Sequence, residues 1–156
     1  MLIRVIAVGT RMPGWVDETV ADYAHRLPPE IRIEWREVRA EPRTRSADAA
    51  RWLAREADRL RAAIPEGAHI VALDERGEDL DTMRLARALA RWRDQARPVA
   101  ILIGGPDGID PALKAAAHET IRLSSLTLAH AMVRVLLAEQ LFRAWSILAG
   151  HPYHRA

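Results

Sequence analysis

The sequence predicts an α/β fold with a mainly parallel sheet and helices on both of its faces. Apolar runs of strand length alternate with helical patterns along the chain, which is typical of βαβ units. The run VAILI at 99–103 is aliphatic at every position, as expected for a parallel strand buried on both faces. The 156 residues suffice for one domain, so we expect a single domain over residues 1–156.

The first half of the chain is expected to contain two strands and two helices. Residues 2–8 are the expected first strand, and after a turn at 11–14 apolar residues recur at helical spacing from Val16 to Leu27. Residues 31–36 alternate between apolar and charged side chains, which predicts a strand with one wetter face near the edge of the sheet. Ser46 is the expected N-cap of a helix that runs to about Ile64.

The second half is expected to contain three strands and three helices. The strands are residues 70–73, 99–103 and 120–123, and the helices are residues 82–92, 111–117 and 129–148. Asp110 is the expected N-cap of the short helix and Gly150 the C-cap of the last one. Residues 74–79 are expected to form a loop, in which Asp74 is a turn or cap residue rather than a catalytic acid.

Three of the expected strands end in residues that suit a ligand site. These residues are Leu73 at the end of one strand, Gly104 and Gly105 after another, and, from the end of the third strand onward, Leu123, Ser124, Ser125, Leu126, Thr127 and Leu128. Ligands of open parallel sheets collect beyond the carboxyl ends of the strands, so we expect these residues to share one crevice. Glycines there permit positive φ and a close approach of ligand to backbone. The alternative is an ordinary sheet edge with a tight turn.

The absence of two phosphate-binding motifs restricts the class of ligand. The sequence around Gly104 matches neither the phosphate-binding loop G-x-x-x-x-G-K-[ST] nor the dinucleotide fingerprint G-x-G-x-x-G, so a phosphate ligand is not supported. The 123–128 segment carries no charge and combines hydroxyls with aliphatic side chains. An apolar slot edged by backbone groups suits an adenine, and the lack of nearby cations suits a positive centre. S-adenosylmethionine has both features.

Composition excludes several classes of protein. The chain has no cysteine, which excludes disulfides and thiolate metal sites, and we expect no metal and a cytoplasmic location. No apolar run approaches membrane-spanning length. The net charge of +2 is small, and Lys114 is the only lysine. A local group of arginines, Arg36, Arg39, Arg43 and Arg45, is either an RNA contact or a solvated loop.

The last expected helix is apolar on most of its sides. Such a helix is covered by its own domain, by a partner subunit, or by both. We expect a homodimer through this helix, with Leu137 and Phe142 in the interface. Glu139 and Arg143 are spaced to form an ion pair, and His130 is expected to be a structural residue at the start of the helix.

Four motifs occur in a fixed order in the second half of the chain. They are IGGPDG at 103–108, LSSLTLAH at 123–130, VRVLLAEQLFRAW at 133–145 and HPYHR at 151–155. Together with VIAVGTRMPGWV at 5–16, they resemble the RlmH family of ribosomal RNA pseudouridine methyltransferases, in the SPOUT or α/β-knot class. The resemblance covers nearly the whole chain. It implies a C-terminal trefoil knot, a homodimer, and methyl transfer from S-adenosylmethionine to N3 of a pseudouridine in 23S (large-subunit) ribosomal RNA on the ribosome.

The resemblance also gives the C-terminal tail a role, although terminal residues are normally frayed and contribute little to a fold. The N3 imide proton must leave as the methyl group arrives, so a nearby base helps. His154 is the candidate base, and Arg155 would stabilise charge on the ring carbonyls. Tyr153 would stack on or orient the nucleobase, in the site of the partner subunit.

Two other functions fit parts of the sequence. One is a knotted ribosome-binding or assembly factor without catalytic activity. The other is a hydride-transferring dinucleotide enzyme, which the missing fingerprint disfavours.

Overall fold

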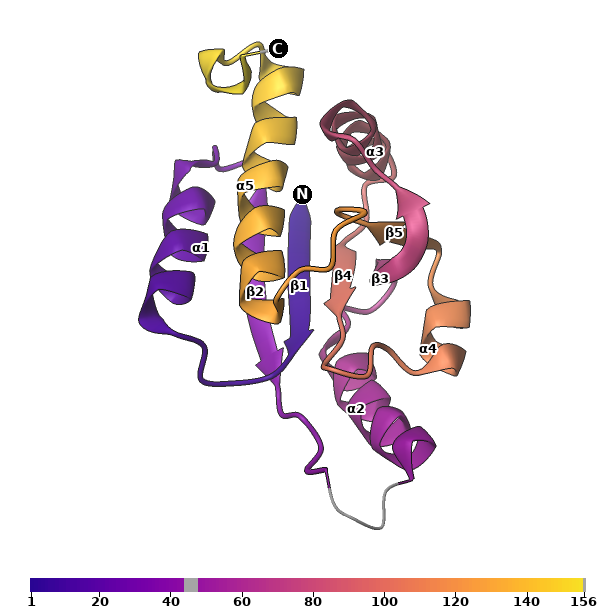
Figure 1. Ribbon diagram of the computed structural model, residues 1–156. Helices are drawn as coiled ribbons and strands as arrows, with labels where there is room; N and C mark the ends of the chain where they lie inside the picture. Colours follow the sequence, from indigo (N-terminus) through magenta and orange to yellow (C-terminus); the bar gives the residue numbers. More distant parts are fainter. Residues whose placement is uncertain (44–47, 156) are drawn as a thin grey trace.

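Five strands pair side by side into one sheet in the computed structural model, which describes residues 1–43 and 48–155 (Figure 1). The strands are β1 (Leu2–Val8), β2 (Arg32–Val38), β3 (His69–Asp79), β4 (Val99–Ile103) and β5 (Glu119–Arg122). Their order is β2-β1-β4-β3-β5, and all four strand pairs are parallel. The predicted parallel sheet is confirmed, and β2 lies at its edge as expected.

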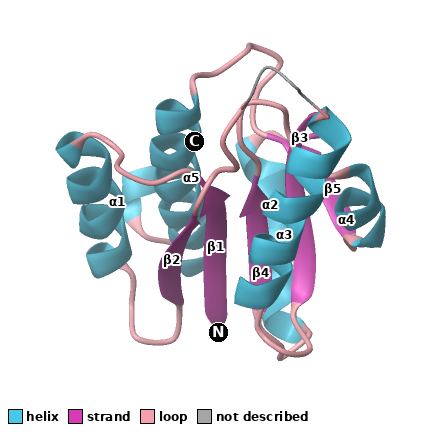
Figure 2. Ribbon diagram, turned by 90° about the horizontal axis from the view of Figure 1, so that it is seen from below, coloured by secondary structure: helices cyan, strands magenta, loops and turns pink. Residues whose placement is uncertain are grey.

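The helices cover both faces of this sheet, which also confirms the prediction. They are α1 (Gly14–Arg26), α2 (Ala49–Ala63), α3 (Thr82–Asp94), α4 (Pro111–Ala116) and α5 (His130–Ala149), followed by a 3-10 helix, η1 (Pro152–His154). Successive side chains of a strand point to opposite faces. Val5 of β1 therefore packs with α3 and α5, whereas its neighbour Ile6 packs with α2 and α4. Helix α1 lies beside α5 (Figure 2).

The helix ends follow the predicted capping chemistry with one exception. The Asp110 side chain accepts bonds from the backbone amides of Ala112 and Leu113, and Gly150 ends α5 in the left-handed conformation with φ of 65°. The exception is α2, which is capped by Asp48 rather than Ser46 because the Asp48 side chain accepts from a first-turn amide. Ser46 lies outside the described residues.

Strand β3 is longer than predicted, and the expected loop at residues 74–79 is wrong. The strand continues to Asp79 by shifting its register against β5 between Leu73 and Glu78. Such a bulge lets pairing resume after an interruption. An ion pair of 3.1 Å between Arg122 and Asp79 holds the resumed pairing. Pairing with β5 therefore outweighs the low strand propensity of these charged residues.

The expected positions of Leu137 and Phe142 in a subunit interface are wrong. Leu137 is 0% exposed and Phe142 is 3% exposed, because the sheet, α3 and α1 of the same chain cover them. The exposed apolar residues of α5 are Met132 and Leu148. The predicted ion pair is confirmed, with Arg143 Nε 2.8 Å from a Glu139 oxygen.

Among the described residues, no helix is both long and apolar enough to cross a membrane. The trefoil knot stays a prediction.

The bulge in β3 generates a stability prediction. A Cβ added to Gly77 would lie 2.5 Å from the backbone carbon of Ile121, so Gly77→Ala must displace β5. We expect a loss of about 1–3 kcal/mol in the free energy of unfolding, measured by urea titration. The control is Gly14→Ala, since a Cβ there meets nothing within 4 Å and Gly14 begins α1, so it should stabilise by about 0.4–1 kcal/mol. Equal stabilities for the two variants would contradict the bulge.

Candidate active site

The carboxyl ends of the parallel strands surround one pocket of about 1130 Å³. All nine residues that the sequence assigned to a ligand site line it: Leu73, Gly104, Gly105, Leu123, Ser124, Ser125, Leu126, Thr127 and Leu128. The prediction that these strand ends share a crevice is therefore confirmed. That this strand-end pocket binds a cofactor stays a prediction.

The glycines after β4 serve the turn itself. The expected positive φ at Gly104 and Gly105 is wrong, because Gly108 takes that conformation with φ of 83°. A Cβ at Gly104 would lie 2.5 Å from the backbone of Gly108, and a Cβ at Gly105 would lie 3.1 Å from Cγ1 of Val8. Residues 104–108 therefore fold so tightly that a side chain at Gly104 would clash with the backbone, and one at Gly105 would have to displace Val8.

The sequence had suggested an uncharged pocket, but charged side chains line part of it. Three acidic and three basic residues lie along it: Asp74, Glu75, Asp107, Arg76, Lys114 and Arg122. Lys114 Nζ lies 2.8 Å from Oδ2 of Asp74, and the Arg76 amide donates to Oδ1 at 2.8 Å. Burial opposes ionisation of Asp74, but these bonds outweigh it and lower its pKa. Asp74 thus lies within β3, paired with Lys114, and the prediction that it is a turn or cap residue is wrong.

A buried arginine fixes the start of α5 next to the pocket. Arg134 donates to Oε2 of Glu37 at 2.6 Å, to the Gly9 carbonyl at 2.8 Å, and through Nε to Nε2 of His130 at 3.0 Å. His130 lines the pocket. Burial, and then the Arg134 guanidinium, lower the pKa of His130. The imidazole is therefore a neutral acceptor in a structural role, as the sequence predicted.

The end of β1 and the residues after it also line the pocket, which the sequence did not predict. Val8, Gly9 and Met12 line it because the strand order places β1 directly beside β4. A glycine after the first strand was the available signal. It could not be used without knowing that β1 is a central strand.

The C-terminal tail is docked rather than frayed, so that expectation is wrong. The Tyr153 hydroxyl donates to Glu139 Oε1 at 3.0 Å and lies 3.2 Å from the Tyr23 hydroxyl. Its ring packs edge-on against Phe142, with the centroids 4.7 Å apart. Burial, and then the bonds to Tyr23 and Glu139, raise the pKa of Tyr153, so its phenol stays protonated. Arg143 also donates to the carbonyl of His154 at 3.1 Å.

The tail and the pocket lie at opposite ends of α5 (Figure 1). The 20 residues of this helix span about 30 Å at 1.5 Å per residue. The predicted catalytic residues Tyr153, His154 and Arg155 therefore do not join the predicted cofactor residues within one chain.

The arginines around residue 40 differ in their surroundings. Arg43 forms ion pairs with Glu56 and Asp107, whereas Arg36 and Arg39 are exposed and Arg45 lies outside the described residues. Contact with RNA here stays a prediction. No cluster of three or more histidine or carboxylate side chains that could hold a metal occurs in residues 1–43 and 48–155.

Comparison with known proteins gives consistent matches over the whole chain. A family model described as "Predicted SPOUT methyltransferase" matches residues 1–154. A protein of Bordetella petrii named ribosomal RNA large subunit methyltransferase H is 60% identical over 156 residues, covering 100% of both chains. A protein of the same name from Ralstonia nicotianae is 58% identical over 155 residues, covering 99% of both.

Among solved structures, the SpoU methyltransferase AviRb from Streptomyces viridochromogenes, in complex with the cofactor AdoMet, matches with a TM-score of 0.45. It shares 15% identity, over 90% of this chain and 56% of that one.

The lowered pKa of His130 predicts that the protein loses stability in acid. Below about pH 6.5 the unfolded chain binds a proton at this residue that the folded chain does not, so the stability falls as the pH falls. His130→Gln retains an acceptor for Arg134 but cannot titrate. Urea unfolding at about pH 7.5 and about pH 5.5 should therefore show a smaller loss for this variant than for the parent.

The control is His25→Gln, which removes an imidazole from the exposed surface. It should keep the parent's loss of stability between the two pH values. Identical losses in the parent and in His130→Gln would exclude His130 as the titrating group.

Proposed function

The chain belongs to the SPOUT methyltransferase family, and from that premise we propose that it methylates N3 of a pseudouridine in large-subunit ribosomal RNA. The methyl donor is S-adenosylmethionine, and the active form is a homodimer on the ribosome. The observation that carries the proposal is the strand-end pocket, lined by the nine residues that the sequence assigned to the cofactor. The printed names of the relatives, which specify the large ribosomal subunit, support the choice of substrate.

The pocket suits the cofactor in size and chemistry. Leu73, Ile103 and Leu123 offer apolar walls for an adenine ring. The 104–108 turn and the hydroxyls of Ser124 and Thr127 offer polar partners at the edge. The basic side chains along the pocket are matched in number by acidic ones, so a sulfonium meets no net repulsion.

Bound S-adenosylmethionine supplies an electrophilic methyl group, and the residues of the chain do the rest. His154 accepts the N3 proton of the nucleobase as the new bond forms. Arg155 stabilises the negative charge that builds on the ring carbonyls. Tyr153, whose phenol is held by Glu139 and Tyr23, keeps these two residues in position and orients the base.

The length of α5 is the reason for a homodimer. His154 and Arg155 follow the end of the helix, about 30 Å from the pocket at its start, so a second copy must supply the tail that completes each site. Trp15 of α1 and Met132 of α5 are 49% and 40% exposed. Apolar side chains exposed on this pair of neighbouring helices suit a two-fold contact.

The runner-up is a ribosome-binding factor without catalytic activity. It is compatible with the same fold but gives no role to a pocket of about 1130 Å³. An assay of methyl transfer to large ribosomal subunits distinguishes the methyltransferase from the non-catalytic factor.

We predict methyl transfer to large ribosomal subunits from a strain that lacks the corresponding activity. The assay measures incorporation of labelled methyl groups, followed by mass spectrometry of the modified nucleotide. Ser125→Arg places a cation in the pocket and should weaken S-adenosylmethionine binding at least ~10-fold, with an unchanged melting temperature because Ser125 is exposed. No incorporation by the unmodified protein, despite tight ribosome binding, would favour the assembly factor.

A second prediction tests the shared site. His154→Ala should abolish methylation, and Ser125→Arg should do so at cofactor concentrations well below its raised Kd. When the two variants are co-expressed with different tags, mixed dimers combine an intact pocket with an intact tail once per dimer. Random pairing should then restore about a quarter of the parental rate. No recovery in purified mixed dimers would mean that pocket and tail act within one chain.

A further inference from the structure

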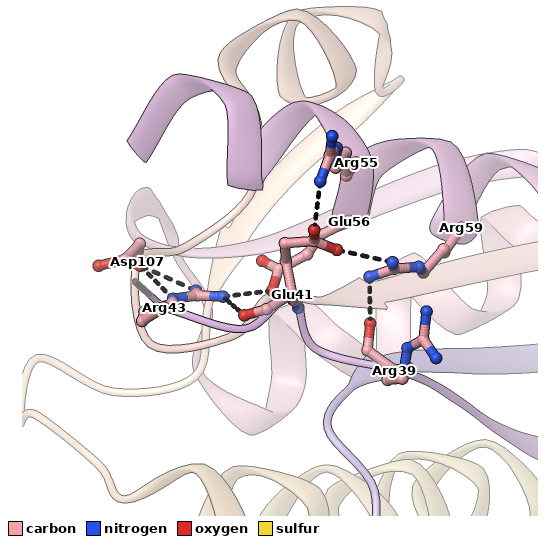
Figure 3. A network of polar contacts seen from close by, with 7 residues as sticks. All are labelled: Arg39, Glu41, Arg43, Arg55, Glu56, Arg59 and Asp107. Carbon is pink, nitrogen blue, oxygen red and sulfur yellow. Dashed lines mark hydrogen bonds and ion pairs between the residues drawn. The ribbon is translucent and has the colours of Figure 1, made fainter. Parts of the chain in front are cut away.

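A charge network with a buried centre joins residues 41–43, which follow β2, to the 104–108 turn (Figure 3). Its centre is Glu56 of α2, which is 2% exposed. Oε2 of Glu56 accepts bonds from the Glu41 amide at 2.9 Å and from Nη1 of Arg43 at 2.8 Å. A carboxylate is costly to bury unless it is paired, so Arg43 is needed at this position.

Arg43 carries the network to the pocket. Its Nε and Nη2 donate to Oδ2 of Asp107 at 3.0 Å and 2.8 Å, and Asp107 lies in the turn that lines the pocket. A guanidinium can bind two carboxylates at once through its planar fork, whereas an ammonium acts as a single point charge. We call this contact of Arg43 with Glu56 and Asp107 the Arg43 bridge.

Glu56 also touches the turn directly. Its Oε1 is buried and has no hydrogen-bond partner among the described residues. This atom lies 3.6 Å from the place where a Cβ of Gly105 would be. The carboxylate therefore packs against the inner side of the turn while the Arg43 bridge holds its outer side.

Few backbone hydrogen bonds restrain the turn. Its only backbone bond within residues 104–108 joins the Gly108 amide to the Gly105 carbonyl at 3.0 Å. Three of its five residues are glycines, which have large conformational freedom in the absence of restraints. The position of the turn thus depends on contacts with neighbouring elements.

We propose that Arg43 and Glu56 are positioning residues for the cofactor, which hold the 104–108 turn in its binding conformation without touching the ligand. This inference rests on the proposed function, because it takes S-adenosylmethionine as the occupant of the pocket. A turn that is ordered in advance binds more tightly than one that must be ordered by the ligand. Loss of the bridge therefore weakens binding and leaves the chemical step intact.

The other half of the network provides a matched control. Glu41 is paired with Arg55 at 2.7 Å and with Arg59 at 2.6 Å, on the side away from Asp107 (Figure 3). Arg55→Met removes an arginine and an ion pair from α2, the helix that carries Glu56, but leaves the Arg43 bridge complete.

The test compares Arg43→Met, Arg43→Lys and Arg55→Met by calorimetry with S-adenosylmethionine, by thermal melting, and by steady-state methylation. Both Arg43 variants should raise the Kd and the KM for the cofactor about 10-fold at unchanged kcat, since lysine cannot span both carboxylates. Arg55→Met should bind like the parent. A purely structural role would lower the melting temperature of Arg43→Met and leave its Kd unchanged, and that result would overturn the proposal.

Asp107→Asn removes the charge at the outer end of the Arg43 bridge. Because Asp107 is exposed, this variant should fold and can test the proposal even if Arg43→Met does not fold. It should weaken binding to a similar extent. If Asp107 acts through Arg43, the double variant Arg43→Lys with Asp107→Asn should bind S-adenosylmethionine no worse than either single variant. Additive losses would mean that Asp107 touches the cofactor itself and would overturn the proposal. If the parent protein fails to bind S-adenosylmethionine, the proposed function fails as well, whereas a normal parent with normal variants refutes only the bridge.

Discussion

The buried Arg134 guanidinium fixes the helix on which the candidate site depends. It joins β2, through Glu37, to the Gly9 carbonyl after β1 and to His130 in the first turn of α5. The start of α5 is thereby held beside the carboxyl ends of the central strands, where the pocket lies. Because α5 has 20 residues and is about 30 Å long, its other end and the tail are far from that pocket. A single helix thus positions both sets of predicted functional residues and also separates them.

Three ion pairs connect the elements that surround the pocket. Arg134 restrains the segment after β1, the Lys114–Asp74 pair joins α4 to the middle of β3, and the Arg43 bridge restrains the turn after β4. The first and third contacts tie a loop to a neighbouring helix or strand, and the second ties a helix to a strand. Glycine turns have little intrinsic preference for one shape, so such side-chain contacts determine the shape of the pocket before any ligand arrives.

Local patterns were sufficient to predict the sheet, its parallel pairing and the nine pocket residues, since strand ends in a parallel sheet must meet at one edge. They were insufficient wherever the outcome depends on a partner distant in sequence. Residues 74–79 have the composition of a loop, yet β5 recruits them into β3. Gly9 joins the pocket only because β1 lies beside β4. Leu137 and Phe142 suited an interface until α1 and α3 covered them, and the docking of Tyr153 depends on Tyr23, 130 residues away.

The proposed function requires that the tail of one chain complete the pocket of another. A direct test is a pulsed electron paramagnetic resonance distance between two chains, one carrying a spin label at Ser125→Cys and the other at Arg155→Cys. The chain has no native cysteine, so labelling is specific, and mixed dimers report only the distance between chains. The account predicts a distance clearly shorter than the ~30 Å length of α5. A distance equal to or longer than that helix, or no dipolar signal between the chains, would contradict it.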